Sequence, residues 1–241
     1  MVRGSEDMPG RSPSLTEQVM EYVRRSVVSR EMEPGKLYSV YQLSDELKVS
    51  RSPVRDALLR LEEAGLVRFE RNRGFRILPT RPEDVAEIFA LRLAIEVPTA
   101  RRAALNAESD FRQRLQDCDA LLRRYAESGR EDEFFENDQK LHDIIMEAGG
   151  SSRGRVLVNR LRVSTRLLGA STAGDSRTLQ DILDEHEPIV KAILSNDSEA
   201  AGLAMDRHLR RTGKLLIAQT CRREGDPRDP GKLWDQLTSG Y

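Results

Sequence analysis

The sequence predicts a mainly α-helical fold: an N-terminal winged helix-turn-helix with a small β-hairpin wing, followed by an all-α helical bundle. Two short helical patterns joined by a turn, between residues 39 and 61, indicate the helix-turn-helix. Two short apolar segments around a turn at residues 71–74 indicate the wing. Beyond residue 83 the pattern is helical almost without interruption. At 241 residues the chain can hold either one large domain or a small one and a medium one.

The first helix is expected over about residues 15 to 30. Ser14 and Glu17 have the spacing of a capping box, and apolar residues then recur at helical spacing. Pro34-Gly35 ends this pattern, because proline disfavours a helical residue before it and glycine supplies a turn.

The next two helices form the predicted helix-turn-helix. Ser39 begins a short second helix, and Ser52 is expected to cap the third, with Pro53 at its first position, where a missing N–H costs nothing. The second helix of such a pair enters the DNA major groove. Its side chains that point away from the apolar stripe are Arg51, Ser52 and Arg55.

Two strands, over residues 66–70 and 75–78, are expected to form the wing. Between residues 51 and 76 the sequence has seven arginines and four acidic residues, a local net charge of +3 in a chain of net charge −1. Such a patch suits DNA phosphates and, at the wing tip, the narrow minor groove. The alternative is that the arginines only solvate an exposed hairpin.

A short linker and a run of helices follow. The prolines around residues 80–82 predict a semi-rigid connection. The helices are expected near residues 83 to 106, 109 to 128, 131 to 149, 153 to 172, 176 to 195 and 197 to 220. The expected divisions are a flexible N-terminus (1–13), the winged domain (14–79), the linker (80–82), the helical domain (83–221) and a mobile tail (222–241).

Only three histidines occur in the chain, and the helical pattern predicts that their side chains converge on one point. Asp138 and His142 are four residues apart and share a helix face. His186 and His208 flank a turn near residue 196 at about ten residues on each side, so an antiparallel helix pair brings them level. One carboxylate and three imidazoles suit a divalent metal: zinc, nickel, manganese or iron. The alternative is three unrelated histidines.

The remaining composition indicates a soluble cytoplasmic protein. No stretch approaches the roughly 18 to 20 apolar residues that span a bilayer, and the N-terminus has no apolar signal core. Cys118 and Cys221 are expected to be reduced thiols. Imidazole must be neutral to bind a metal, so metal affinity is expected to fall below about pH 6.5.

The N-terminal residues resemble the winged-helix domain of the GntR family of bacterial transcription regulators. The resemblance rests on Pro34-Gly35, on the run Val49 to Leu58, on Gly65-Leu66-Val67 and on Arg73-Gly74. It implies that Arg51, Ser52 and Arg55 contact DNA from the recognition helix, and that Arg73 and Gly74 do so from the wing. Lys48 departs from the family pattern, which often has glycine or asparagine at this turn.

The helical half resembles the ligand-binding FCD domain of the FadR-type branch of that family. The resemblance rests on Arg92 and Glu96, on Asp138 and His142, and on the His186 and His208 pair. It implies a bound divalent metal, with zinc favoured, held by Asp138, His142, His186 and His208, and a small carboxylate effector held by the metal and Arg92. The alternative for Arg92 is a simple salt bridge to Glu96.

These observations together predict a transcription regulator that binds a palindromic operator as a homodimer and responds to a small carboxylic acid. Two other functions stay open. One is a metal-dependent hydrolase, for which only Glu147 and Glu187 lie near the ligands in sequence as candidate bases. The other is a regulator whose histidines orient an organic ligand without a metal.

Overall fold

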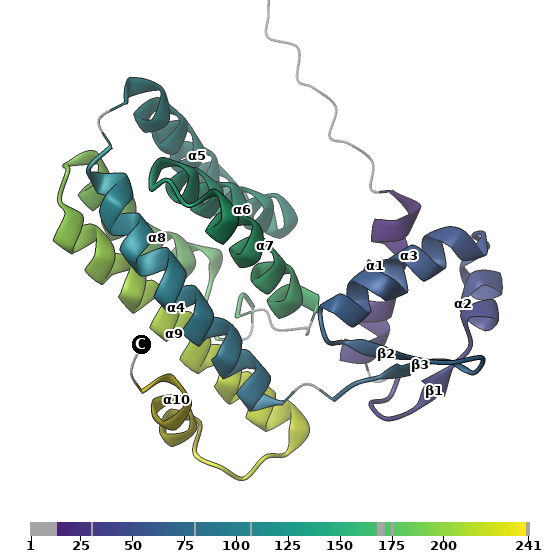
Figure 1. The fold of residues 1–241 in the computed structure, drawn as a ribbon. Helices are drawn as coiled ribbons and strands as arrows, with labels where there is room; N and C mark the ends of the chain where they lie inside the picture. The colour runs from purple at the N-terminus through teal and green to yellow at the C-terminus, as the bar shows by residue number, and fades with distance from the viewer. Residues whose placement is uncertain are drawn as a thin grey trace, which may run out of the picture. The chain divides into compact units, whose positions relative to one another are not determined.

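The chain folds into two compact units that divide after Pro79, the C-terminal limit predicted for the winged domain (Figure 1). The computed structural model describes residues 14–29, 31–79, 81–106, 108–167, 172–174 and 176–239, apart from the side chains of residues 28, 166 and 167. The predicted flexible N-terminus, residues 1–13, lies outside the described residues. Each unit has its own buried apolar residues.

The first unit is a winged helix-turn-helix. Its elements are α1 (Leu15–Val28), β1 (Leu37–Tyr38), α2 (Val40–Leu47), α3 (Arg51–Glu63), β2 (Val67–Glu70) and β3 (Gly74–Ile77). The strands form an antiparallel sheet in the order β1-β3-β2. The sequence did not predict β1, because two residues are too few to show an alternating pattern. The core contains Val23, Val54, Leu58, Leu61 and Phe75, all fully buried.

The helix-turn-helix differs from the prediction at the start of α3. Ser50, not Ser52, is the N-cap, and its side chain makes no capping hydrogen bond. Pro53 is therefore in the third helical position, which it tolerates because no N–H of the first turn has a partner within the helix. Lys48 ends α2 in the left-handed region, at φ 53° and ψ 38°, where the family often has glycine or asparagine. A packed domain tolerates this conformation at a cost of about 1 kcal/mol.

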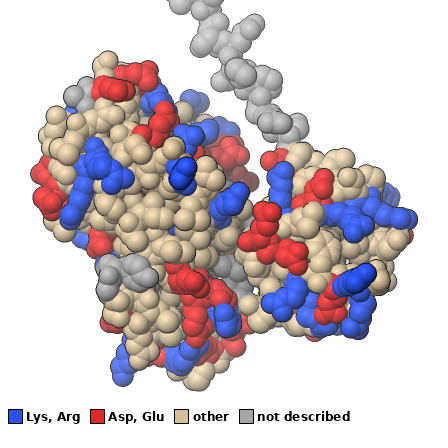
Figure 2. All heavy atoms as spheres, in the orientation of Figure 1, with Lys and Arg blue, Asp and Glu red and all other residues tan. Residues whose placement is uncertain are grey.

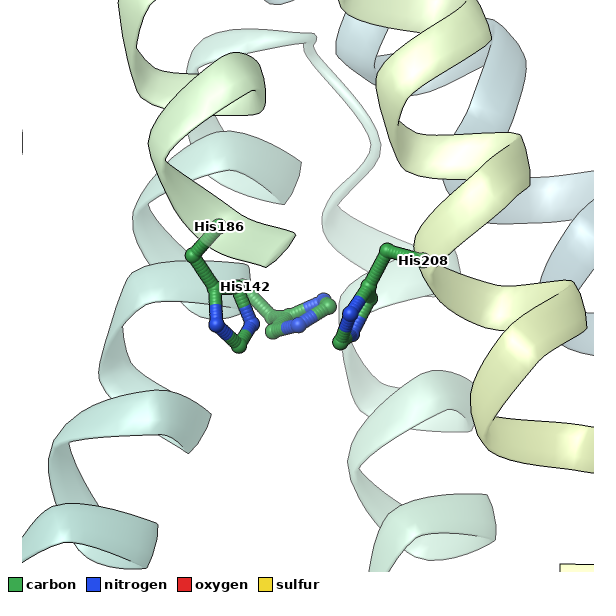
Figure 3. A group of neighbouring side chains, drawn as sticks. All are labelled: His142, His186 and His208. Carbon is green, nitrogen blue, oxygen red and sulfur yellow. The ribbon is translucent and has the colours of Figure 1, made fainter. Parts of the chain in front are cut away.

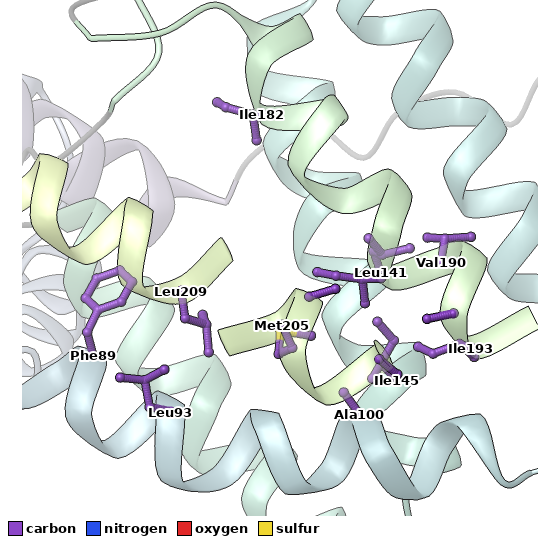
Figure 4. Close-up of a cluster of buried hydrophobic side chains, with 14 of the residues drawn as sticks. Phe89, Leu93, Ala100, Leu141, Ile145, Ile182, Val190, Ile193, Met205 and Leu209 are labelled. Carbon is purple, nitrogen blue, oxygen red and sulfur yellow. The ribbon is translucent and has the colours of Figure 1, made fainter. Parts of the chain in front are cut away.

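The second unit is a bundle of α-helices. Its elements are α4 (Pro82–Ala104), α5 (Ser109–Ser128), α6 (Glu131–Ala148), α7 (Ser152–Leu167), α8 (Leu179–Leu194), α9 (Ser198–Glu224) and α10 (Pro230–Thr238). The long helices α4 and α9 lie side by side, and α8 packs on α9 (Figure 1). Apolar side chains from α4, α6, α8 and α9 meet between them (Figure 4). None of the helices among the described residues is long and apolar enough to cross a membrane.

The predicted mobile tail, residues 222–241, is wrong over its described part. The helix α9 continues to Glu224, and α10 packs on α4 and α9. Trp234 is 1% exposed and lies against Gly213, where an added Cβ would be 2.1 Å from the indole ring. Arg228 pairs with Glu83. The prediction gave weight to the charges and prolines of this segment and overlooked Trp234. Burial of this large apolar side chain stabilises the packing of α10.

Candidate DNA interface and metal centre

The recognition helix α3 exposes the side chains that the sequence assigned to DNA. Arg51, Ser52 and Arg55 are all exposed, whereas the apolar residues of the same helix are buried. The Arg51 guanidinium lies 4.1 Å from the centre of the Tyr41 ring, which limits its motion without removing its hydrogen-bond donors. Lys and Arg side chains gather around α2 and the start of α3 on the face drawn in Figure 2.

The wing presents fewer free charges than its sequence suggests. Arg73 is 66% exposed but lies 3.2 Å from Glu70, and Arg76 pairs with the same carboxylate at 2.6 Å. The structure requires glycine at position 74. The φ of Gly74 is 128°, and an added Cβ would lie 2.0 Å from the carbonyl oxygen of Tyr38. This close approach lets β1 pair with β3. The predicted DNA contact of Gly74 is thus additional to a structural requirement.

The helical unit brings its three histidines together at one buried point (Figure 3). His142 comes from α6, His186 from α8 and His208 from α9, and one ring nitrogen of each lies within 4.8 Å of the others. We call these residues the histidine cluster. Asp138 lies beside it: its Oδ1 is 3.0 Å from Nε2 of His186 and 3.9 Å from Nε2 of His142. The four side chains that the sequence predicted to converge therefore do so.

Each imidazole is held by an outer partner at Nδ1. The Nδ1 of His142 contacts Glu96, that of His186 lies 2.8 Å from the carbonyl oxygen of Ile182, and that of His208 lies 3.1 Å from Glu185. Because these acceptors require a proton on Nδ1, each neutral ring has its lone pair on Nε2. Among the described residues, Nε2 of His142 and of His186 is buried and makes no hydrogen bond. Buried lone pairs of this kind, with outer partners that fix the rings, fit a metal ion.

Asp138 is oriented by an arginine from α7. Its Oδ2 accepts a hydrogen bond from Nη2 of Arg162, so Oδ1 is the oxygen left toward the histidines. Burial alone would raise the pKa of Asp138, but the charge of Arg162 holds it well below its usual value. Asp138 is therefore a carboxylate at neutral pH, which is the form that binds a metal.

Burial keeps His142 and His208 neutral. It is the largest influence on His142, whose pKa falls to about 4, and the charge of Arg162 acts in the same direction. Burial also lowers the pKa of His208 well below its usual value, with His186 and His142 adding to the effect. Neutral imidazoles and an ionised Asp138 form a donor set suited to zinc or a similar divalent ion.

Arg92 makes the salt bridge to Glu96 that the sequence offered as an alternative, and one of its donors has no partner in the described part of the chain. Its Nε lies 2.6 Å from Oε1 of Glu96, and both side chains are buried. Its guanidinium is also 4.9 Å from the centre of the Phe89 ring. The Nη2 atom is buried without a hydrogen-bond partner among the described residues. Since Oε2 of Glu96 contacts His142, one carboxylate joins Arg92 to the histidine cluster.

Sequence reasoning missed the supporting residues of this site. Glu96 was considered only as a partner of Arg92, although a carboxylate has a second oxygen that can hold another group. Arg162 and Glu185 gave no signal, because charged residues in helices are usually exposed and only the packing shows that these two face inward. Glu185 also pairs with Arg177 at 2.6 Å and with the more exposed Arg211 at 3.1 Å.

A winged helix-turn-helix joined to a helical domain with a buried histidine cluster is typical of a DNA-binding regulator. Residues 15–77 match the bacterial regulatory proteins of the gntR family, and residues 87–211 match the FCD domain. The HTH-type transcriptional repressor RspR of Escherichia coli K12 is 27% identical over 195 residues, covering 81% of this chain and 86% of its own. The gluconate operon transcriptional repressor of Bacillus licheniformis is 26% identical, covering 73% and 74%.

Solved structures agree on the fold. Escherichia coli McbR/YncC is similar with a TM-score of 0.65 at 20% identity, over 86% of this chain and 99% of its own. A GntR regulator from Rhodococcus sp. RHA1 is similar with a TM-score of 0.61 at 23% identity, over 90% of this chain and 100% of its own. This chain belongs to the GntR family of bacterial transcription regulators, and its second unit is an FCD ligand-binding domain. The relatives are regulators and not enzymes, which removes the hydrolase alternative.

Proposed function

We propose that this regulator binds a palindromic operator as a homodimer, and that a small carboxylate bound beside a divalent metal in its FCD domain changes its affinity for that operator. Arg51, Ser52 and Arg55 are proposed to read the major groove from α3 because their side chains are exposed. Arg73 and the backbone at Gly74 are proposed to contact DNA from the wing. A two-fold dimer places two such units on two half-sites.

The proposed metal ligands are Asp138, His142, His186 and His208. One observation carries this assignment: outer partners hold Nδ1 of all three rings, and two of the Nε2 atoms are buried without a partner next to Oδ1 of Asp138. The chemistry of this set favours zinc, with nickel, manganese and iron as alternatives, and the ion would offer positive charge and free positions to a carboxylate oxygen. Arg92 is proposed as the second anchor of the effector.

The residues of the proposed site come from several helices, so a ligand bound there would contact several parts of the bundle. Arg92 and Glu96 belong to α4, Asp138 and His142 to α6, Arg162 to α7, and the other histidines to α8 and α9. A ligand that binds among them changes contacts of five helices at once. It alters operator affinity only as far as it binds the DNA-competent and incompetent states with different free energy.

An operator titration tests the proposal. Operator DNA is first selected from a random pool. Its binding by protein purified without chelator is then followed by fluorescence anisotropy, with and without each member of a panel of small carboxylic acids. Elemental analysis gives the metal content of the same protein. A coupling of typical size would change operator affinity by about 5- to 150-fold. His208→Ala should abolish the response and leave DNA binding largely intact, because the winged unit has its own core.

Arg207→Ala is the matched control, since Arg207 is the exposed neighbour of His208 on α9. It should respond as the wild type does. If a responding acid acts equally on His208→Ala, or on metal-stripped protein, the histidines do not act through a metal. The remaining interpretation is then an organic ligand that they orient without one.

A further inference from the structure

A series of three side chains leads from the segment before α8 to the histidine cluster. Arg177, two residues before the first residue of α8, is buried, and its Nη1 donates to Oε2 of Glu185 at 2.6 Å. The same oxygen lies 3.1 Å from Nδ1 of His208, one of the proposed metal ligands. All three side chains are buried. The ring of His208 is therefore held by a carboxylate that is itself held by an arginine.

Three side chains fix the orientation of the Arg177 guanidinium. Besides its contact with Glu185, its Nε donates to Oγ1 of Thr172 at 2.7 Å and its Nη2 donates to Oγ1 of Thr212 at 3.0 Å. The N–H donors of a guanidinium have a fixed planar geometry. A guanidinium that serves three acceptors at once therefore presents Nη1 to Glu185 in one direction.

Glu185 has a second arginine, but that residue constrains it less. Nε of Arg211 lies 3.1 Å from Oε1 of Glu185, yet this oxygen accepts no hydrogen bond among the described residues. The side chain of Arg211 is 59% exposed, so water and salt screen its charge. Arg177 is buried and makes a charge-assisted hydrogen bond. The position of Oε2 beside His208 therefore depends on Arg177 more than on Arg211.

We propose that Arg177 is a positioning residue of the metal centre: it holds Glu185 where that carboxylate fixes the ring of His208 for the ion. This inference rests on the proposed metal site and adds a residue that acts on the ligands through Glu185. A carboxylate at Nδ1 fixes the tautomer and orientation of a metal-binding imidazole and makes Nε2 a better ligand. Loss of such an outer partner typically lowers metal affinity by about 10- to 100-fold.

The zinc affinity of the full-length protein tests this inference. The metal-free wild type and its variants compete for zinc with a chromophoric chelator of known affinity. Arg177→Met removes the guanidinium and should weaken zinc binding by about 10- to 100-fold. Arg211→Met is the matched control, because it makes the same change at the other arginine of Glu185. It should bind zinc within about 3-fold of the wild type, since an exposed ion pair contributes little.

A double variant distinguishes positioning from a general loss of structure. Glu185→Gln removes the carboxylate through which Arg177 is proposed to act. In that background Arg177→Met should weaken zinc binding little further, because both substitutions break the same series of contacts. Circular dichroism in chelator checks that each variant is folded. If Arg177→Met does not fold, Arg177→Lys takes its place: it keeps the charge but not the three contacts, and should bind zinc more weakly than Arg211→Lys.

The outcomes separate this inference from the proposed function. Equal zinc affinities of Arg177→Met and Arg211→Met, or of the two lysine variants, overturn the role of Arg177. Losses that add fully in the double variant also overturn it, because Arg177 would then act independently of Glu185. Failure of the wild type to bind zinc, or zinc binding that His208→Ala leaves unchanged, overturns the proposed metal site itself.

Discussion

Acid should destabilise the metal-free FCD domain through its buried histidines. Burial lowers the pKa of His142 to about 4 and that of His208 well below its usual value. In the unfolded chain both rings titrate near pH 6.5. Between that value and the lowered folded value, the unfolded chain takes up protons that the folded chain does not. The free energy of unfolding is therefore highest above pH 6.5 and falls as the pH drops below it.

The size of the effect follows from the shift of His142. Each unit of pKa shift corresponds to about 1.4 kcal/mol, so this residue alone removes roughly 2 kcal/mol of stability by pH 5, and His208 adds a loss of the same sign. Asp138 and Glu96 do not add to the change of stability between pH 7 and pH 5. The pKa values of Asp138 and Glu96 are lowered, so their contribution is present above the unfolded value near pH 4 and is lost only in stronger acid.

Trp234 makes the measurement specific to this domain. It is the only tryptophan of the chain and is buried in the second unit, and all three histidines lie in that unit as well. Urea denaturation followed by tryptophan fluorescence, in chelator at pH 7, 6 and 5, gives the free energy of unfolding at each pH. The variant His142→Asn keeps an N–H donor for Glu96 but does not titrate, so its fall should be smaller. Equal stability at pH 7 and pH 5 in the wild type, or an equal fall in the variant, would refute the reasoning.

Two further substitutions test the DNA interface and the C-terminal helix. Arg55→Ala should cost about 1 to 3 kcal/mol on the operator and barely change non-specific binding, because Arg55 is exposed on α3 where base edges are read. Equal losses on both DNAs in an anisotropy titration would make it a phosphate contact instead. Trp234→Ala should lower the stability of the FCD domain by about 3 to 5 kcal/mol, since a fully packed aromatic side chain is lost against Gly213. The measurement is urea denaturation followed by circular dichroism, and a loss below 1 kcal/mol would show that α10 is not held by this contact.

Much of the fold could be predicted because its signals are local. Capping residues such as Ser14 and regular apolar spacing placed the helices to within a few residues. The expected end of the helix over 153 to 172 is not tested, because residues 168–171 lie outside the described part of the chain. The errors arose where local signals were weak or misleading. The strand β1 depends on pairing with β3, and α10 depends on Trp234 reaching a glycine far away in sequence. Neither contact leaves a periodic pattern.

The candidate site also has a part that the sequence predicted and a part that it did not. Helical spacing and an antiparallel hairpin were enough to bring Asp138 and the three histidines together. The sequence did not predict the residues that orient them, because their burial depends on the packing of the whole bundle. These residues are Glu96, Arg162 and Glu185. The same burial changes the expected chemistry: an ordinary imidazole binds protons below about pH 6.5, but His142 in the folded domain stays neutral to about pH 4. Metal affinity of the folded protein should therefore persist to lower pH than the sequence alone indicated.

The position of Arg92 and Glu96 on α4 explains how ligand binding could reach the DNA-binding unit. The helix α4 begins at Pro82, the last residue of the expected linker, and the two residues lie in its middle. Glu96 contacts both Arg92 and His142, so under the proposed function a ligand at Arg92 and a metal at His142 would both act on α4 through one carboxylate. Since coupling is reciprocal, operator DNA would then change the affinity of the FCD domain for its ligand by the same factor as the ligand changes operator affinity. On that proposal, the shared carboxylate makes α4 the helix through which metal, effector and operator DNA would be coupled.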